Sequence, residues 1–217
     1  MTETKYQIYE DYMQSIMRDS AHDQEHIYRV LRAARMIAAC EERVDMDILI
    51  VSCLLHDIGR PEEFRDPRIC HAGAGGEKAY RFLLEHGWDE ERAGRVRECI
   101  IRHRYRSDNP PDSIEAKILF DADKLDATGA IGIARTLIYD GIVSEPIYTL
   151  KTDGTVSGGE GDEHPSFFQE YKNKLETLYD KFYTVKGQEL AQARRAAAEA
   201  FYRSLLTEVE MLYYNQV

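Results

Sequence analysis

The sequence lacks the features of several protein classes. Its four cysteines are widely spaced and include no Cys-x-x-Cys pair: Cys40, Cys53, Cys70 and Cys99. We expect them to be reduced structural residues, not a disulfide framework or a zinc knuckle. Residues 1–10 are polar, which predicts no signal peptide. No uncharged apolar run approaches the roughly 20 residues that span a bilayer. These absences predict a cytoplasmic protein without a membrane partner.

Basic residues are scarce relative to acidic ones. The chain has 28 Lys and Arg against 39 Asp and Glu, which gives a net charge of −11. This balance disfavours stable nucleic-acid binding, because such binding depends on basic patches against phosphates. A local basic pocket for a small phosphate ester is still compatible with it. Hydrophobic residues form 43% of the 217 residues, which is enough for a sizeable core.

Apolar residues recur mostly at helical spacing, which predicts an all-α helical bundle. The expected helices lie at about 4–18, 24–42, 45–57, 71–86, 90–104, 113–139 and 188–214, and residues 167–183 are amphipathic. The charged, proline-containing residues 60–68 predict a loop. Residues 140–165 predict a mobile insertion, with a lid or an interface arm as alternatives to an ordinary loop. We expect one domain over residues 1–217, with its core at about 20–140 and a C-terminal helical extension at about 166–214.

A histidine and an aspartate end the uncharged run of residues 48–55. His56 and Asp57 follow Ile-Leu-Ile-Val-Ser-Cys-Leu-Leu, which predicts that both are buried. An unpaired buried charge is costly, so both groups need partners. A divalent metal would satisfy both, because imidazole nitrogen and carboxylate oxygen coordinate such ions. Alternatively, Asp57 orients His56 within the core, or the pair caps a helix.

Three further histidines lie where helices are expected. His26 precedes Val30 by one turn and points toward the same interior, and His103 extends the apolar stripe of its helix. His71 begins the helix at 71–86, next to a run of small residues. These small residues predict close helix packing or approach of the backbone to a ligand, because glycine weakens a helix. For each histidine, a core residue with satisfied hydrogen bonds is the alternative interpretation.

Three acids lie between an apolar segment and a run of small residues, at Asp121, Asp123 and Asp126. Not all three can easily face solvent on a tightly packed helix, although a solvated face is the alternative. An inward acid would need a cation or strong hydrogen-bond donors.

Taken in order, His26, His56-Asp57 and Asp123 resemble the His…His-Asp…Asp pattern of the HD superfamily of metal-dependent phosphohydrolases. The family's last acid tends to lie in an Ala-Asp-basic-Leu string, which residues 122–125 match. The resemblance covers most of the chain. It is closest to small bacterial HD-domain hydrolases with His-Asp-Ile-Gly-Arg and Asp-Ala-Asp-Lys-Leu-Asp-Ala segments. It implies an HD-domain helical bundle with a metal site between facing helices. Asp121 and Asp126 stay rivals to Asp123 as the last ligand.

The resemblance also implies a cofactor. The four residues would hold one divalent ion: Mn, Mg, Co, Ni, Fe or Zn. Some family members bind a second ion through extra histidines between the His-Asp pair and the last acid, and His71 and His103 stand there. In that case one or two ions would bind per chain, with Asp57 as the bridge.

The implied activity is hydrolysis of a phosphomonoester or phosphodiester in a nucleotide or another small phosphorylated substrate, by a metal-activated water. Asp57 would then serve catalysis as well as metal binding. Glu62 or Glu63 would position water or shuttle a proton. Three cationic residues are candidates for phosphate binding: Arg60, Arg104 and Lys124. The alternative for these two glutamates and three cationic residues is that each is an ordinary solvated surface charge.

Two other functions stay open at this stage. Some proteins that resemble this family use two irons to oxidise a small molecule, and the same ligands would serve. A non-catalytic regulatory or binding module that keeps the fold is the other alternative. No Gly-Tyr-Pro signature follows the His-Asp pair, so the cyclic-dinucleotide phosphodiesterase branch is not favoured. The sequence leaves a homo-oligomer open.

Overall fold

The structure, a computed structural model, describes residues 4–17, 24–104 and 109–214. Within these ranges most residues are helical, and the only extended pairing is an isolated bridge between Leu150 and Val156. The all-α expectation is therefore confirmed. Contacts divide the chain into two compact units, Met1–Asp123 and Lys124–Val217. The expectation of a single domain stays a prediction.

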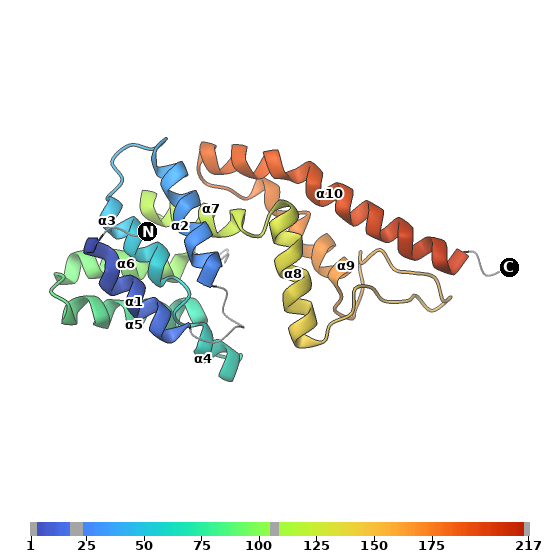
Figure 1. Cartoon of the computed structure of the whole chain (residues 1–217), viewed down its shortest axis with the longest axis horizontal. Coiled ribbons are helices and arrows are strands. Elements are labelled where there is room, and N and C mark those ends of the chain that lie inside the picture. Colours follow the sequence, from blue (N-terminus) through green and yellow to red (C-terminus); the bar gives the residue numbers. More distant parts are fainter. Residues whose placement is uncertain (1–3, 18–23, 105–108, 215–217) are drawn as a thin grey trace. The chain divides into compact units, whose positions relative to one another are not determined.

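The first unit is built around one apolar helix, α3. Its elements are η1 (Thr4–Tyr6), α1 (Gln7–Ile16), α2 (Gln24–Ala38), α3 (Met46–Leu55), α4 (Arg60–Arg65), α5 (His71–Glu85), α6 (Glu90–Arg102) and most of α7 (Ile114–Leu125). Every residue of α3 from Ile48 to Leu55 is buried, and α3 contacts α1, α2, α5 and α6. In Figure 1, α5 and α6 lie side by side, as their contacts require. A helix that is hydrophobic all round is stable only inside such a bundle.

The chain enters and leaves α3 through well-defined ends. Asp45 caps the helix by accepting hydrogen bonds from the backbone N–H groups of Asp47 and Ile48. At the other end the expected loop at 60–68 is wrong in its first part, because Arg60–Arg65 forms the short helix α4. Proline suits the first turn of a helix, where its missing N–H is not needed, and acidic residues there complement the helix dipole. Pro61 and the glutamates that follow it are thus helix-starting signals, whereas Pro67 lies in the loop after α4.

Glycine contacts hold α4 against α5. A Cβ atom on Gly59 would lie 2.1 Å from the carbonyl oxygen of His71, and one on Gly75 would lie 3.1 Å from the backbone nitrogen of Gly59. On the next face of α5, a Cβ atom on Gly76 would lie 2.8 Å from Cγ1 of Ile101. The small residues of α5 therefore serve close packing of the backbone, which is one of the two expectations for this stretch.

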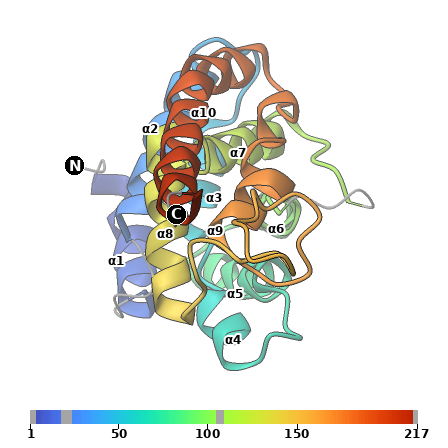
Figure 2. The same cartoon turned by 90° about the vertical axis from the view of Figure 1, so that its right-hand side faces the viewer.

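The second unit contains α8 (Gly129–Val143), α9 (Phe167–Glu170), the π-helical turn η2 (Tyr171–Leu175), η3 (Leu178–Asp180) and α10 (Val185–Tyr214). The long helix α10, red in Figure 2, contacts α8, yellow, and η3. Two expectations need correction here. The helix expected at 113–139 is two helices, because Gly129 takes a φ of +64° and begins α8. The expected irregular segment begins only after Val143, since α8 continues to that residue.

The irregular segment after α8 is fastened to its own unit. The hydroxyl of Tyr202 on α10 donates a hydrogen bond to the carbonyl oxygen of Gly158, at 2.6 Å. Gly159 has a φ of +92°, and a Cβ atom there would lie 2.2 Å from the backbone of Phe168. Whether this segment is mobile stays a prediction. In the part of the chain that the structure describes, no helix is both long and apolar enough to cross a membrane.

We predict that Gly59→Ala lowers the free energy of unfolding by about 1–3 kcal/mol, because the new methyl group meets the backbone of α5 and cannot be accommodated by a side-chain rotation. Urea unfolding followed by circular dichroism measures this. Gly73→Ala is the matched control. A Cβ atom on Gly73 meets nothing within 4 Å, so this change should stabilise the helix by up to about 1 kcal/mol. Equal effects of the two changes would contradict the packing argument.

Candidate metal centre

The buried end of α3 supplies the centre of a cluster of histidines and carboxylates. His56 follows the last residue of α3 and is fully buried. Its Nδ1 atom lies 2.9 Å from the carbonyl oxygen of Cys53. A carbonyl can only accept, so Nδ1 carries the hydrogen and Nε2 keeps its lone pair. The local helix geometry thus prepares His56 as a ligand through Nε2.

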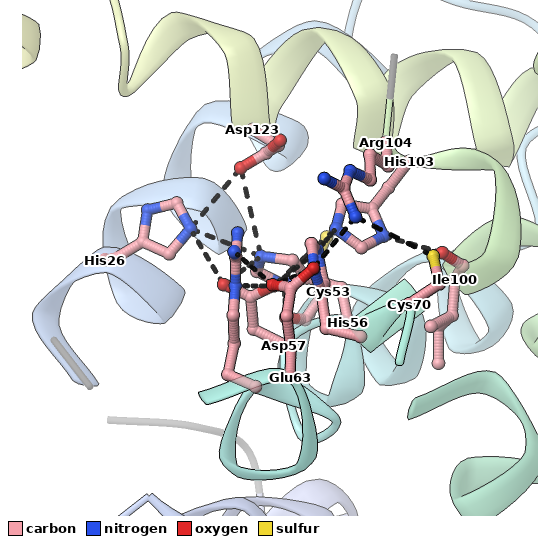
Figure 3. Close-up of polar contacts among 12 residues, drawn as sticks. His26, Cys53, His56, Asp57, Glu63, Cys70, Ile100, His103, Arg104 and Asp123 are labelled. Carbon is pink, nitrogen blue, oxygen red and sulfur yellow. Dashed lines mark hydrogen bonds and ion pairs between the residues drawn. The ribbon is translucent and has the colours of Figure 1, made fainter. Parts of the chain in front are cut away.

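This nitrogen and three ligand atoms around it form a first group of four. Nε2 of His26, on α2, lies 3.3 Å from Nε2 of His56 and 3.3 Å from Oδ1 of Asp123, on α7. Nε2 of His56 lies 4.0 Å from the same Asp123 oxygen. Oδ2 of Asp57 lies 3.7 Å from both histidine nitrogens. Figure 3 shows these side chains converging from separate helices.

The spacing of this group fits one divalent cation. Four ligands at about 2.0–2.2 Å from a tetrahedral ion lie roughly 3.3–3.6 Å from one another. The distances in the group run from 3.3 to 4.0 Å. His26, His56 and Asp123 also offer ligand atoms that all lie within 4.8 Å of one another. The donor set and its spacing could therefore hold a metal ion.

A second group lies on the other side of Asp57. Nε2 of His71, the first residue of α5, lies 3.3 Å from Nε2 of His103, which follows α6. Each of these nitrogens lies 3.6 Å from Oδ1 of Asp57. His103 donates through Nδ1 to the carbonyl oxygen of Ile100 at 2.6 Å, so its Nε2 keeps the lone pair. Asp57 thus turns one oxygen toward each pair of histidines, which is the geometry of a bridging carboxylate.

Burial sets the protonation of these groups. It lowers the pKa of His56 to about 4. Burial and then the positive charge of Arg60 lower the pKa of His71 to about 4. Burial raises the pKa of Asp57, but the charges of Arg60 and the histidines outweigh this and hold it well below its ordinary value. Near neutral pH these histidines are neutral and Asp57 is ionised, which are the states that bind metal.

Two arginines and a glutamate adjoin the second group. Glu63, on α4, accepts a hydrogen bond from Nδ1 of His71 at 2.7 Å, and this fixes the lone pair of His71 on Nε2. The other oxygen of Glu63 accepts from Arg104 at 2.9 Å. Arg60 bonds to both Glu63, at 3.2 Å, and Asp57, at 3.0 Å. Each arginine side chain is 41% exposed.

Two other residues were expected to serve chemistry, Glu62 and Lys124. Glu62 bonds to Lys78 and Arg65, so its contacts do not support a role beside the histidines, and that role stays a prediction. Lys124 is the first residue of the second unit, and its contact with phosphate also stays a prediction.

Of the three acids on and after α7, the structure brings Asp123 to His26 and His56. Asp121 is fully buried. The carboxylate of Asp126 is buried and pairs with Arg135 at 2.9 Å. The sequence argument favoured Asp123 for its place in the string of residues 122–125. Its distances to His26 and His56 are compatible with that choice, which stays a prediction.

Sequence reasoning missed the groups that orient the histidines. The carbonyl oxygens of Cys53 and Ile100 each lie three residues before the histidine that they fix. A histidine just past the end of a helix can reach back to this carbonyl, so its position at the end of an apolar run was the available signal. The role of Glu63 in holding His71 had no signal of this kind, because the two residues belong to different helices.

Comparisons with known proteins decide the family. A family model for the HD domain matches residues 24–128, a range that contains every metal-ligand candidate. YpgQ, an uncharacterized protein of Bacillus subtilis, is 31% identical over 204 residues, covering 91% of this chain and 90% of that protein. The chain belongs to the HD-domain family.

Solved structures agree with this assignment. A predicted HD superfamily hydrolase from an uncultured Thermotogales bacterium matches with a TM-score of 0.63 and 28% identity, over 93% of this chain and 91% of that one. The crystal structure of B. subtilis YpgQ in complex with ADP matches with a TM-score of 0.70 and 29% identity, over 94% of this chain and 97% of that one. This HD-domain protein is therefore similar along nearly its whole length to members of the hydrolase group.

We predict that Asp123→Asn lowers the metal content of the purified protein by about one ion per chain, because it weakens the ligand set of His26 and His56. Elemental analysis measures this. Asp126→Asn is the control: it changes an acid of the same string whose carboxylate pairs with Arg135 instead. Full metal content in Asp123→Asn would show that another acid is the ligand.

We also predict that the metal-free protein loses stability as the pH falls from about 6.5 to about 4. The folded-state pKa of His56 lies below the ordinary value of 6.5, so the unfolded chain takes up the proton first. Below about pH 4, where His56 is protonated in both states, the free energy of unfolding should be lower by on the order of 3 kcal/mol. Urea unfolding at a series of pH values measures the loss. His56→Gln should make this pH dependence less steep and leave the part that His71 contributes. Equal slopes in the two proteins would contradict the prediction.

Proposed function

We propose that this HD-domain protein is a metal-dependent phosphohydrolase that acts on a nucleotide or a related small phosphate ester. The observation that carries the proposal is the convergence of four buried histidines on the two oxygens of Asp57, with arginines beside them. The ligands alone would suit several metal-dependent reactions. The adjoining guanidinium groups favour a substrate with anionic oxygens.

The residues present would hold one or two divalent ions. His26, His56, Asp57 and Asp123 form the first ligand set, and His71 and His103 with Asp57 form the second. When bound, such an ion activates water for attack and polarises a phosphoryl oxygen. Burial keeps His56 and His71 neutral by lowering the pKa of each, and hydrogen bonds to backbone carbonyl oxygens orient His56 and His103.

Arg60 and Arg104 would bind and orient the phosphate. A guanidinium group offers N–H donors in a planar fork that matches two phosphate oxygens, and it stays charged at any relevant pH. Charge that develops on the phosphoryl oxygens during attack would be met by these groups. Both arginines donate hydrogen bonds to Glu63 in this structure, so Glu63 also fixes the position of their side chains before a phosphate binds.

Glu63 is a candidate to position water or to move a proton, but its oxygens already accept three hydrogen bonds, from His71, Arg60 and Arg104. It would need to release one arginine to take up either role. Binding of a phosphate by that arginine would provide such a release.

The nucleotide part of the proposal draws on a relative. YpgQ, which is 29% identical in its ADP complex, accommodates a nucleoside diphosphate in the crystal. A ligand of this kind has the anionic oxygens that Arg60 and Arg104 would recognise. The ligand set is compatible with cleavage of either a phosphomonoester or a phosphodiester. The test below separates the two.

The test is hydrolysis by metal-stripped protein to which Mn²⁺, Mg²⁺, Co²⁺ or Ni²⁺ is returned, with nucleoside mono-, di- and triphosphates and a generic phosphodiester as substrates. We expect phosphate or pyrophosphate release that depends on the metal. Asp57→Asn should lower kcat/KM by at least about a thousandfold, because it weakens both ligand sets.

Arg65→Gln is the control for the assay, since Arg65 pairs with Glu62 outside the histidine cluster. It should keep wild-type activity. Inactivity of the wild-type protein with every metal and substrate would refute the phosphohydrolase. Bound iron with an oxygen-dependent change in absorption would instead indicate the oxygenase.

A further inference from the structure

Arg60 occupies the carboxylate oxygen that a second cation would need. Its Nε atom donates a hydrogen bond to Oδ1 of Asp57 at 3.0 Å. The same oxygen lies 3.6 Å from Nε2 of His71 and 3.6 Å from Nε2 of His103. The other oxygen of Asp57 faces His26 and His56. The bond of Arg60 therefore falls on the second ligand set.

The position of Arg60 is set by the backbone. Gly59 packs so closely on α5 that a Cβ atom would lie 2.1 Å from the carbonyl oxygen of His71. Arg60, the next residue and the first of α4, is thereby held beside the helix end that bears His71. The guanidinium group approaches Asp57 from an anchored segment.

Arg60 also has a second carboxylate within reach. Its Nη1 atom lies 3.2 Å from Oε2 of Glu63, one turn along α4. If Asp57 gave up its bond to Arg60, the guanidinium group would keep an anionic partner. Release from Asp57 therefore need not leave the charge of Arg60 unpaired.

Two cations cannot share this position without cost. A guanidinium group keeps its charge at any relevant pH, and like charges a few ångströms apart repel strongly where water is excluded. Asp57 is 4% exposed, and His71 and His103 are almost fully buried. A divalent ion between these two histidines would therefore meet the charge of Arg60 at short range.

We propose that Arg60 is a built-in competitor of the second cation: it bonds to Oδ1 of Asp57 in the absence of that ion, and when the ion binds it gives up this bond and keeps the one to Glu63. The competition acts on the set of His71, His103 and Asp57 and leaves the first set largely unaffected. The inference rests on the proposed function in one respect. If Arg60 binds the substrate phosphate, then phosphate and the second cation strengthen each other's binding, since coupling between two ligands is reciprocal.

The test is a titration of the metal-stripped protein with Mn²⁺ alone. Isothermal calorimetry and the electron paramagnetic resonance signal of free and paired Mn²⁺ would give the affinity of each site. Arg60→Gln and Arg60→Met remove the charge, and we expect them to raise the affinity for the second ion at least about tenfold. Arg60→Lys keeps the charge, so the affinity of this variant for the second Mn²⁺ ion should stay near that of the wild-type protein. The affinity for the first Mn²⁺ ion should change little in all three Arg60 variants.

Arg65→Gln is the matched control, because Arg65 is an arginine of the same short helix that bonds to Glu62 and to the carbonyl oxygen of Pro61. It should leave both affinities unchanged. Circular dichroism establishes that each variant is folded, and two neutral variants guard against the failure of one. A second ion detected only in the neutral variants would support the competition.

Other outcomes separate this inference from the proposed function. If the wild-type protein binds two Mn²⁺ ions and neither neutral variant gains affinity, the competition is refuted and the phosphohydrolase stands. If neutral and lysine variants gain affinity equally, charge is not the cause and the inference also fails. If no protein binds any Mn²⁺, the metal centre itself is refuted, and with it both proposals.

Discussion

The burial of one carboxylate, that of Asp57, is the constraint on which the rest of the site depends. It lies 4% exposed at the end of an apolar helix, where an uncompensated charge would be very costly. The charge of Asp57 is compensated by its neighbours. Imidazoles face both carboxylate oxygens, and the guanidinium group of Arg60 donates a hydrogen bond to one of them. This need explains why so many polar groups gather inside a core that is otherwise made of Ile, Leu and Val.

Rigid surroundings make this arrangement useful for chemistry. Helix α3 contacts four other helices of its unit, and the histidines at the ends of α3 and α6 are fixed by carbonyl oxygens of their own helices. Ligands held in this way need little rearrangement when a cation binds, which favours both affinity and catalysis. The close approach at Gly59 extends the same rigidity to α4 and hence to Arg60 and Glu63.

Charge is distributed unevenly around the centre. The chain carries a net charge of −11, yet two arginines lie beside the second ligand set, both held by Glu63. A phosphate that bound here would meet two guanidinium groups that Glu63 already orients. In the proposed function, metal binding and substrate binding would draw on the same few side chains, so that each would alter the electrostatic field that the other meets.

The sequence by itself determined the helical class, most helix positions and the order of the candidate ligands, because helical periodicity and local motifs depend on neighbouring residues. It could not determine distances between helices. Only the tertiary structure decided that each oxygen of Asp57 faces its own pair of histidines, and that Glu63, not Glu62, reaches His71. The break at Gly129 was likewise beyond periodicity, because both flanking segments favour helix. Side chains from separate elements meet only through packing, and packing is a property of the whole fold.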